Sequence, residues 1–369
     1  MKIKLKAIRL LTVFSVILIG FAQADIGGKK VILIHGFNPF HIVSPPSDNG
    51  QSDAADYWEE IDPAFVRQGG PNSNIIHWPS HKRLTGSGGI ISIIQPQIQA
   101  LLDENYCANQ CVIVTHSTGD LVSRFLIKNK NSIFGSSQAS KLKIAAVVDL
   151  AGAGGGTELA NFGVGVSNGV NFGGSIISGL LEYAGFYFSF GLNVGVMNDL
   201  QTSVARNHAT NGFPAIPHLR VAGTGNEIFG FATKPIIHGA DDSVVPMHSA
   251  CGAAYAYGYD SCSRDTRSDG KITYISNAPS ASQLYDYHYP IIMSETIAHN
   301  EMKSNTTGNK MTSIRSIESA YNSSTVNNQA INIDDYEKRE WWDWWSKYRY
   351  ISGSSSRSVS TMLVNSVIQ

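Results

Sequence analysis

The chain has 369 residues, a formal net charge of −1 and 43% hydrophobic residues. It is long enough to bury a large core, and α/β folds of this length often form a single domain. A charge so close to zero provides no basic surface for nucleic acid, so we expect no nucleic-acid partner.

The first 24 residues have the pattern of a secretory signal peptide. An apolar stretch at 10–21 follows a basic start and precedes the Ala-Gln-Ala of residues 22–24; the basic residues are Lys2, Lys4, Lys6 and Arg9. We expect cleavage before Asp25, although an uncleaved N-terminal anchor is the alternative. The apolar stretch is short for a bilayer. The pattern predicts a secreted or periplasmic protein with no transmembrane segment after cleavage.

The cysteine pattern agrees with export. The chain has four cysteines, which are Cys107, Cys111, Cys251 and Cys262. Cysteines of exported proteins usually form disulfides, and the spacing favours Cys107–Cys111 and Cys251–Cys262. No spacing is typical of a zinc site, so we expect neither a metal nor a cofactor.

Apolar strands alternate with helical patterns along the first half of the chain. Strands are predicted at 30–39 (ending in a turn), 75–78, 111–116 and 143–148, and helices near 54–61, 90–102 and 120–127. Pro96 is expected near the first turn of its helix or at a kink. This alternation predicts an α/β fold, with a mostly parallel sheet covered by helices on both faces.

A short motif interrupts this pattern after the strand at 111–116. It reads Thr115-His116-Ser117-Thr118-Gly119 and is followed at once by a helical pattern. A sharp strand-to-helix turn here would lift Ser117 out of the sheet and aim the N-terminus of the helix at it. This pattern resembles the nucleophile elbow of α/β-hydrolases, usually written G-x-S-x-G, with Thr115 in place of the first glycine. An ordinary serine at a helix N-cap is the alternative interpretation.

A Gly-rich, apolar stretch follows the strand at 143–148. Residues 151–156 are predicted to form a flexible loop, and residues 161–200 combine glycines with large apolar side chains. α/β-hydrolases, which the elbow resembles, commonly insert a lid at this place, so the resemblance implies a cap or lid insertion at 151–210. Gly would supply hinges for a mobile lid, and a fixed helical cap is the alternative.

The later part of the chain contains the remaining polar candidates. Residues 219–225 are predicted as a strand and turn, and residues 271–276 as the last strand of the sheet. Asp241 and Asp242 lie between these strands, and His288 and His299 follow the second.

The C-terminal region has an unusual composition. Residues 305–332 are rich in Ser, Thr and Asn, and residues 334–350 concentrate Trp and Tyr. The aromatic spacing is helical, which favours packing against the body; a lipid- or glycan-contacting patch is the alternative. The Ser-rich stretch at 352–360 is expected to be loosely held.

The motifs together resemble secreted bacterial lipases and esterases of the α/β-hydrolase superfamily, over about residues 30–302. The resemblance rests on the His35-Gly36 turn, the elbow, the Asp242-Ser243-Val244-Val245-Pro246 loop and the segment around His299. It implies a catalytic triad of Ser117, Asp242 and His299, with Asp241 and His288 as alternatives. It also implies an oxyanion hole formed by the N–H groups of Phe37 and Thr118.

The resemblance also implies a domain order and an activity. We expect a signal peptide at 1–24, an α/β-hydrolase domain at 25–304 and a C-terminal extension at 305–369. The implied substrate is a carboxylic ester, either triacylglycerol or another long-chain acyl ester. A lipid–water interface is one place where the enzyme could bind such a substrate. A phospholipase, acyltransferase or thioesterase, and a catalytically silent binding protein, are the alternatives. Some relatives hold calcium, for which Glu301 and Asp260 are only weak candidate ligands.

Overall fold

The computed structural model describes residues 25–170, 193–209, 214–225, 236–239, 241–256, 266–267, 271–272, 284–285, 287–293, 297–304, 311–313, 335–341, 343–353 and 356–367. The signal peptide at 1–24, much of the cap, Asp260 and Cys262 lie outside the described residues. The predictions made for them, including the Cys251–Cys262 disulfide, therefore stay predictions. Among the helices described, none combines the length and the apolar character that crossing a bilayer requires.

One sheet organises the described part of the chain. Its order is β1-β2-β4-β5-β6-β9-β10, with β3 beside β2. The strands are β1 (Asp25–Ile26), β2 (Lys29–Ile34), β3 (Ile75–Ile76), β4 (Cys111–His116), β5 (Ile144–Leu150), β6 (His218–Ala222), β9 (His288–Met293) and β10 (Met311–Ser313). β2 to β9 pair in parallel, whereas β1 and β10 are antiparallel at the edges. This order, with a strand–turn–helix at β4, is an α/β-hydrolase fold and confirms the predicted fold class.

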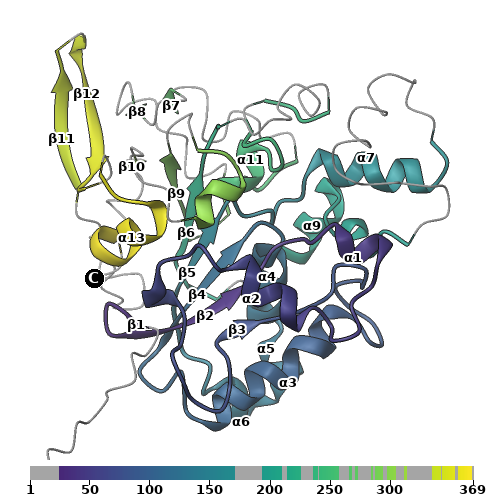
Figure 1. The fold of residues 1–369 in the computed structure, drawn as a ribbon. Helices are drawn as coiled ribbons and strands as arrows, with labels where there is room; N and C mark the ends of the chain where they lie inside the picture. Colours follow the sequence, from purple (N-terminus) through teal and green to yellow (C-terminus); the bar gives the residue numbers. More distant parts are fainter. Residues whose placement is uncertain are drawn as a thin grey trace, which may run out of the picture.

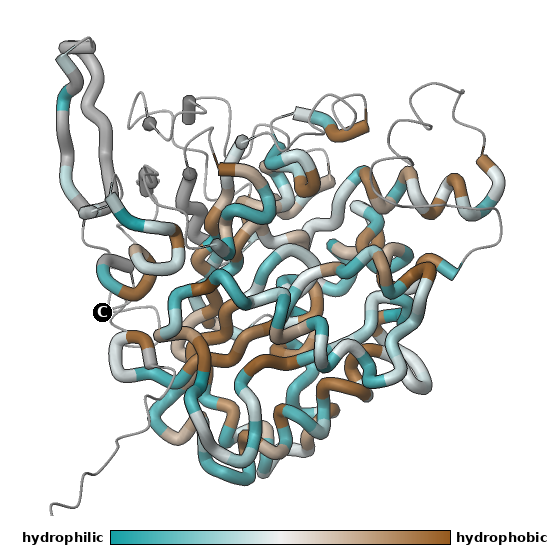
Figure 2. The backbone as a smooth tube through the Cα atoms, viewed as in Figure 1, coloured by the Kyte–Doolittle hydropathy of each residue, from teal (hydrophilic) through white to brown (hydrophobic). Residues whose placement is uncertain are grey.

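The central strands are apolar because both faces of the sheet are covered. Successive residues of a strand point to opposite faces. Ile32 and Ile113 accordingly join one hydrophobic cluster, while Val31 and Val112 join another. Figure 2 shows these strands as hydrophobic segments running through the middle of the molecule.

Helices complete the two layers around the sheet. The first cluster includes side chains of α3 (Ile90–Asp103) and α4 (Gly119–Lys128), and α5 (Lys130–Phe134) and α6 (Ser136–Ala139) follow α4. The second cluster includes Trp58, directly after α2 (Gln51–Tyr57), and residues of the 3₁₀ helices η1 (Pro63–Phe65) and η5 (Asn300–Lys303) and of α13 (Val359–Met362). α13 continues into a π-helical turn, η6 (Leu363–Val367). Figure 1 shows the sheet between these elements.

Other short elements connect the layers at the carboxyl ends of the strands. They are α1 (Phe40–Val43), α7 (Glu158–Ser167), η2 (Gly195–Asn198), α9 (Thr202–Ala209) and α11 (Met247–Ala250). The predicted cap thus begins with α7 and ends with α9. The loop before α7, predicted to be flexible, is instead buried, and the Gly154 N–H donates to Asp120 at 2.7 Å.

Two sequence predictions about strands and helices are corrected by the structure. Of the predicted strand at 271–276 the structure describes β8 (Lys271–Ile272), which pairs with β7 (Thr266–Arg267) in a separate two-stranded sheet and not with the described strands of the main sheet. The last parallel strand is β9, which contains Pro290, and proline is rare inside central strands. Pro96 lies well inside α3, which continues through it, so Pro96 is not near the first turn; the alternative, a kink at this position, stays a prediction.

The aromatic tail forms a β-hairpin rather than the predicted helix. It consists of β11 (Asp335–Glu340) and β12 (Asp343–Ile351), and it projects from the body (Figure 1). Trp341 at its turn is 83% exposed, so this side chain does not pack against the body as predicted. Strand propensity of Trp and Tyr explains the difference from the helical pattern.

The stretch at 352–360 is also more firmly held than predicted. Ser358 and Ser360 are buried, and the Ser360 hydroxyl accepts a hydrogen bond from the Asp62 N–H at 3.1 Å. The Thr361 hydroxyl donates to the Asp62 carboxylate at 2.8 Å. The segment before α13 is thereby attached to the loop after α2.

The predicted Cys107–Cys111 disulfide is confirmed. It closes a short loop directly before β4, with a Cα–Cα distance of 5.0 Å. Both cysteines are buried within the first hydrophobic cluster.

An ion pair ties the end of the predicted cap to the loop before α3. Arg83 donates from Nε and Nη2 to both carboxylate oxygens of Asp199, at 2.8 and 2.7 Å, and the Leu84 N–H donates at 2.9 Å. Burial would raise the pKa of Asp199, but the hydrogen bonds from Arg83, the neighbouring His208, the hydrogen bond from the Leu84 N–H and the charge of Arg83 together outweigh it and lower the pKa to about 2.

Replacing Asp199 by Asn should lower the free energy of unfolding by about 1.5 kcal/mol at neutral pH, because the charged hydrogen bonds are lost. Since the folded-state pKa is depressed, this contribution is present above about pH 4 and disappears as the pH falls through about 2. Urea unfolding at several pH values measures it. Asp103→Asn, on an exposed site of α3, is the matched control with little effect expected. Equal losses in the two variants would contradict the assignment.

Candidate active site

Ser117 lies at a sharp turn between β4 and α4, as the sequence predicts. Its backbone has a φ of 54°, in the left-handed region that non-glycine residues rarely adopt. The turn is held by the main chain: the Ser117 N–H donates to Leu150 at 3.0 Å, and the Ser117 carbonyl accepts from Asp120 and Ala153 at 3.2 and 2.9 Å. The strained serine is therefore fixed by the end of β5 with the loop that follows it, and by the first turn of α4.

The turn after β2 contacts this serine directly. A Cβ placed on Gly36 would lie 2.7 Å from the Ser117 Cβ, and one on Gly119 would lie 2.7 Å from the His35 carbonyl oxygen. Both distances are shorter than real contacts allow, so glycine is required at both positions. The segment that carries the Phe37 N–H consequently lies against the elbow.

Thr115 has a specific partner, which explains why it replaces the usual glycine. Its hydroxyl donates to Asp149 on the neighbouring strand β5 at 2.6 Å. Burial would raise the pKa of Asp149, but the Arg220 guanidinium and the bonds from His218 and Thr115 lower it overall. Thr115 therefore helps to keep a buried carboxylate ionised beneath the elbow.

His299 and Asp242 are hydrogen-bonded to each other. His299 Nδ1 donates to Asp242 Oδ2 at 2.9 Å, and the His299 N–H donates to the Asp242 carbonyl at 3.1 Å. The second carboxylate oxygen accepts from the N–H groups of Val244 and Val245 at 3.1 and 2.7 Å. With Nδ1 facing Asp242, Nε2 is the ring nitrogen left for proton transfer.

The alternative acid has another role in this loop. Asp241 accepts a hydrogen bond from the Ser243 N–H at 2.8 Å. Ser243 has a φ of 82°, the conformation that glycine would adopt without strain. Asp241 thus stabilises the turn, and Asp242 is the residue that faces the histidine.

The alternative base lies elsewhere. His288 begins β9, where it is level with His218 at the amino end of β6, while Ser117 follows the carboxyl end of β4. Its ring stacks on His218 with a centroid separation of 4.5 Å and is hydrogen-bonded to Arg124. The structure therefore brings Asp242 to His299 and leaves His288 in a buried polar cluster.

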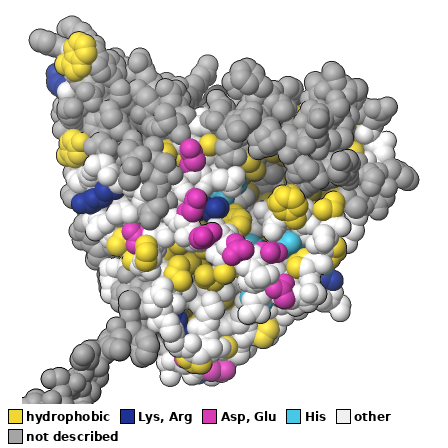
Figure 3. All heavy atoms as spheres, in the orientation of Figure 1, with side chains coloured by type: hydrophobic (Ala, Val, Ile, Leu, Met, Phe, Trp, Pro, Cys, Tyr) yellow, Lys and Arg dark blue, Asp and Glu magenta, His cyan; other side chains and the backbone are white. Residues whose placement is uncertain are grey.

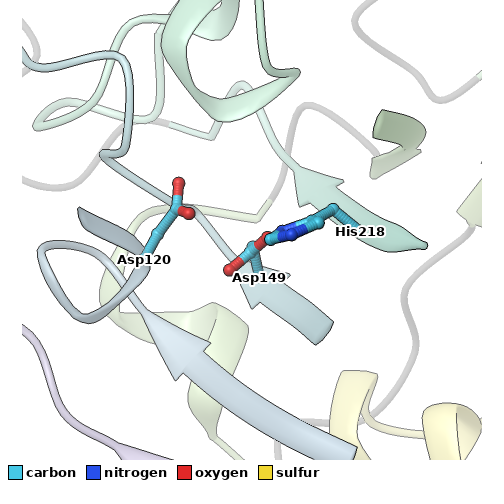
Figure 4. A group of neighbouring side chains, drawn as sticks. All are labelled: Asp120, Asp149 and His218. Carbon is cyan, nitrogen blue, oxygen red and sulfur yellow. The ribbon is translucent and has the colours of Figure 1, made fainter. Parts of the chain in front are cut away.

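That cluster contains residues that could hold a metal ion. Figure 4 shows Asp120, Asp149 and His218, which come from α4, β5 and β6. The Nη1 of Arg220 lies between the two carboxylates, 2.6 Å from Asp120 and 2.8 Å from Asp149. Arg124 adds a second positive charge 3.2 Å from Asp120. Two guanidiniums therefore balance the two carboxylates, and the arrangement fits an ion-pair network better than a metal site.

Sequence reasoning missed this network and Tyr57. The available signal for the network was the pair Asp120 and Arg124. These oppositely charged residues lie one turn apart on an otherwise buried helix. Tyr57 carried no such signal, because its contact with the elbow joins positions 59 residues apart.

Glu301, considered as a calcium ligand, instead holds the histidine loop. Its carboxylate accepts from the Ala298 N–H at 2.8 Å, one residue before His299.

A group of acidic side chains lies near the middle of the face shown in Figure 3, over α2, where Asp56, Glu59 and Glu60 are exposed.

Comparison with known proteins yields only distant similarities. No protein-family model and no curated protein matches the chain. A metagenomic carboxyl esterase has 19% identity and a TM-score of 0.34, covering 62% of this chain and 61% of its own. The phospholipase PlaB from Legionella pneumophila has 14% identity and a TM-score of 0.33, covering 58% of this chain and 44% of its own. Lipase 1 from Pelosinus fermentans has 14% identity and a TM-score of 0.33, covering 75% of this chain and 93% of its own.

The chain thus spans less than two thirds of the first two of these proteins. Similarity at this level says nothing of the reaction, which has to be inferred from the site alone.

His35 beside the elbow is held neutral. Its Nδ1 donates to the Gly36 carbonyl at 2.7 Å, and its Nε2 accepts from the Trp78 N–H at 3.2 Å. Burial lowers the pKa of His35 to about 4, and burial also lowers the pKa values of His116, His218 and His248.

Lowering the pH from about 6.5 to about 4 should therefore destabilise the protein. In this range the histidines of the unfolded chain bind protons, whereas the buried histidines of the folded protein stay neutral. His35 alone should lower the free energy of unfolding by about 3 kcal/mol. Urea unfolding at about pH 7.5 and about pH 4.5 measures the loss. His35→Gln should be less stable at the higher pH but lose less between the two. If the wild type and His35→Gln lost the same free energy of unfolding between the two pH values, His35 would not be kept neutral by the fold.

Proposed function

We propose that the protein is a serine hydrolase that cleaves carboxylic esters. The observation that carries this proposal is the Asp242–His299 hydrogen bond of 2.9 Å, in a loop that reaches the residue next to Ser117. The rings of His116 and His299 are 4.6 Å apart, so the imidazole of His299 lies beside the elbow. A buried acid, a histidine and a strained serine are the groups that such a reaction requires.

In the proposed reaction, Ser117 is the nucleophile. Its Oγ attacks the acyl carbon while Nε2 of His299 takes the hydroxyl proton, and Asp242 stabilises the imidazolium that forms. The tetrahedral intermediate collapses, the C–O bond to the alcohol breaks, and the proton moves from Nε2 to the leaving oxygen. Water then repeats the sequence on the acyl-enzyme, releasing the acid and restoring Ser117.

The negative charge of each intermediate would be stabilised by the N–H groups of Phe37 and Thr118. Such dipoles stabilise charge that develops only in the transition state. Two features support these donors. The turn with Phe37 is packed against Ser117 at Gly36, and Thr118 is the N-cap residue of α4, whose N-terminus carries positive partial charge.

We further propose a long-chain acyl substrate and export from the cytoplasm. Phe40 and Val43 of α1, a few residues after Phe37, are 69% and 48% exposed and would offer an apolar surface to an acyl chain. The Cys107–Cys111 disulfide supports export, because disulfides persist in oxidising compartments.

Ser117→Ala should abolish hydrolysis of p-nitrophenyl esters, lowering kcat by about 10⁴-fold or more, because no acyl-enzyme can form. Ser123→Ala is the matched control: Ser123 is also buried, on α4, but its hydroxyl only donates to the Asp120 carbonyl at 2.9 Å. It should retain nearly full activity.

The same assay decides the base. His299→Ala should be about as inactive as Ser117→Ala, whereas His288→Ala should be less stable but active once folded. Equal, negligible rates for wild type and Ser117→Ala would refute the hydrolase and favour a silent binding protein. Activity that survives in His299→Ala and disappears in His288→Ala would overturn the assignment of the base.

The rate should increase with acyl length, up to about eight carbons or more, because each buried methylene contributes about 0.8 kcal/mol. A series of p-nitrophenyl esters from acetate to palmitate measures kcat/KM for each length. A maximum at acetate would contradict the long-chain substrate while leaving the hydrolase proposal intact. Faster cleavage of a phospholipid or a thioester would favour those alternatives.

A further inference from the structure

The main chain of His299 is attached to the residue that precedes the nucleophile. The Nε2 of His116 donates to the His299 carbonyl at 2.9 Å. On its other side, His299 is bonded to Asp242 through both its N–H and its ring. The histidine is thus held between the acid loop and the elbow.

The other nitrogen of His116 faces Tyr57. Since a carbonyl can only accept, Nε2 of His116 must carry a hydrogen, and in the neutral ring Nδ1 accepts from the Tyr57 hydroxyl. The hydrogen bonds therefore run in one direction, from Tyr57 through the His116 ring to the His299 carbonyl. This direction requires an uncharged imidazole at His116 and a protonated phenol at Tyr57.

The surroundings favour these protonation states. Burial lowers the pKa of His116 well below its ordinary value, and the neighbouring His299 and Lys303 lower it further. Burial also raises the pKa of Tyr57, so that its hydroxyl keeps its proton. The described groups that face this pair include Trp58, edge-on to His116, His35, whose ring centroid is 5.5 Å from that of Tyr57, and Lys303, whose ammonium lies 4.9 Å from the centre of the Tyr57 ring.

Tyr57 also contacts the turn after β2. A Cβ on Gly36 would collide with the Tyr57 hydroxyl, and would lie 3.0 Å from the His116 carbonyl oxygen. The same phenol therefore lies between the elbow and the segment that carries the Phe37 N–H. One side chain from α2 touches two parts of the candidate site.

We propose that His116 and Tyr57 are positioning residues that set the place of His299 relative to Ser117. This inference rests on the proposed function, in which His299 is the base. Because His116 is covalently joined to Ser117, a single hydrogen bond relates the loop of the base to the nucleophile. Neither residue takes part in proton transfer. Their role is geometric, and small displacements of a base are costly: about 1 Å lowers rates by about 100-fold.

Three variants test this role. His116→Phe keeps a buried ring but removes the donor to His299, and should lower kcat by about 10- to 100-fold with KM changed by less than about twofold. Tyr57→Phe removes only the hydroxyl and should lower kcat by about three- to tenfold. His116→Gln, whose amide can both donate and accept, should recover most of the activity lost in His116→Phe.

A matched control separates this role from simple destabilisation. Tyr106→Phe removes another buried tyrosine hydroxyl, which donates to the Val31 carbonyl at 3.0 Å far from the elbow along the sheet. It should lose comparable stability but keep the kcat of the wild type. Titration of reactive serine with a p-nitrophenyl phosphonate gives the concentration of competent enzyme, so that kcat is expressed per functional site.

The outcomes are distinct. Wild-type kcat per titrated site in His116→Phe and Tyr57→Phe would overturn the positioning role while leaving the hydrolase intact. Equal losses in Tyr57→Phe and Tyr106→Phe, or a His116→Gln variant as impaired as His116→Phe, would overturn it as well. A wild-type protein no more active than Ser117→Ala would overturn both proposals, because there would be no base to position.

Discussion

The close approach of α4 to β2 is the constraint on which the candidate site depends. The left-handed backbone at Ser117 is unfavourable, and it persists because Leu150, Asp120 and Ala153 bond to it from both sides. The approach is close enough to exclude a side chain at Gly119. Packing of apolar side chains on α4 and the strands provides the free energy that offsets the strain.

Beneath this turn, electrostatics rather than apolar packing connects the layers. Asp120 on α4, Asp149 on β5 and Arg220 on β6 are each fully buried and mutually paired. Removing charges from water is costly, so such a network stabilises only when every charge is balanced and bonded. Arg124 completes the balance, and the N–H of Gly154 adds a further donor to Asp120. The network therefore makes the relative position of helix and strands specific, because few other arrangements would place both guanidiniums against both carboxylates.

The part of the fold that could be predicted from sequence is the part dictated by local pattern. β4 and β5 are continuous apolar runs, and α3 and α4 have helical spacing, so their positions followed from periodicity. β9 could not be found this way. It contains Pro290, and its place beside β6 depends on pairing with residues some 70 positions earlier. The aromatic hairpin was missed for a related reason: helical and strand patterns overlap when aromatics are frequent, and only cross-strand pairing decides between them.

For the candidate site, the sequence by itself determined the types and order of the groups: the turn at Ser117, and the acidic and histidine segments that follow. The resemblance favoured Asp242 and His299 but kept Asp241 and His288 as alternatives, because adjacent or similar residues have the same local pattern. Only the tertiary structure shows which of these residues meet: Asp242 is bonded to His299, and His288 is enclosed among buried charges. Hydrogen bonds between segments distant along the chain depend on where the folded strands end, and no local pattern encodes that distance.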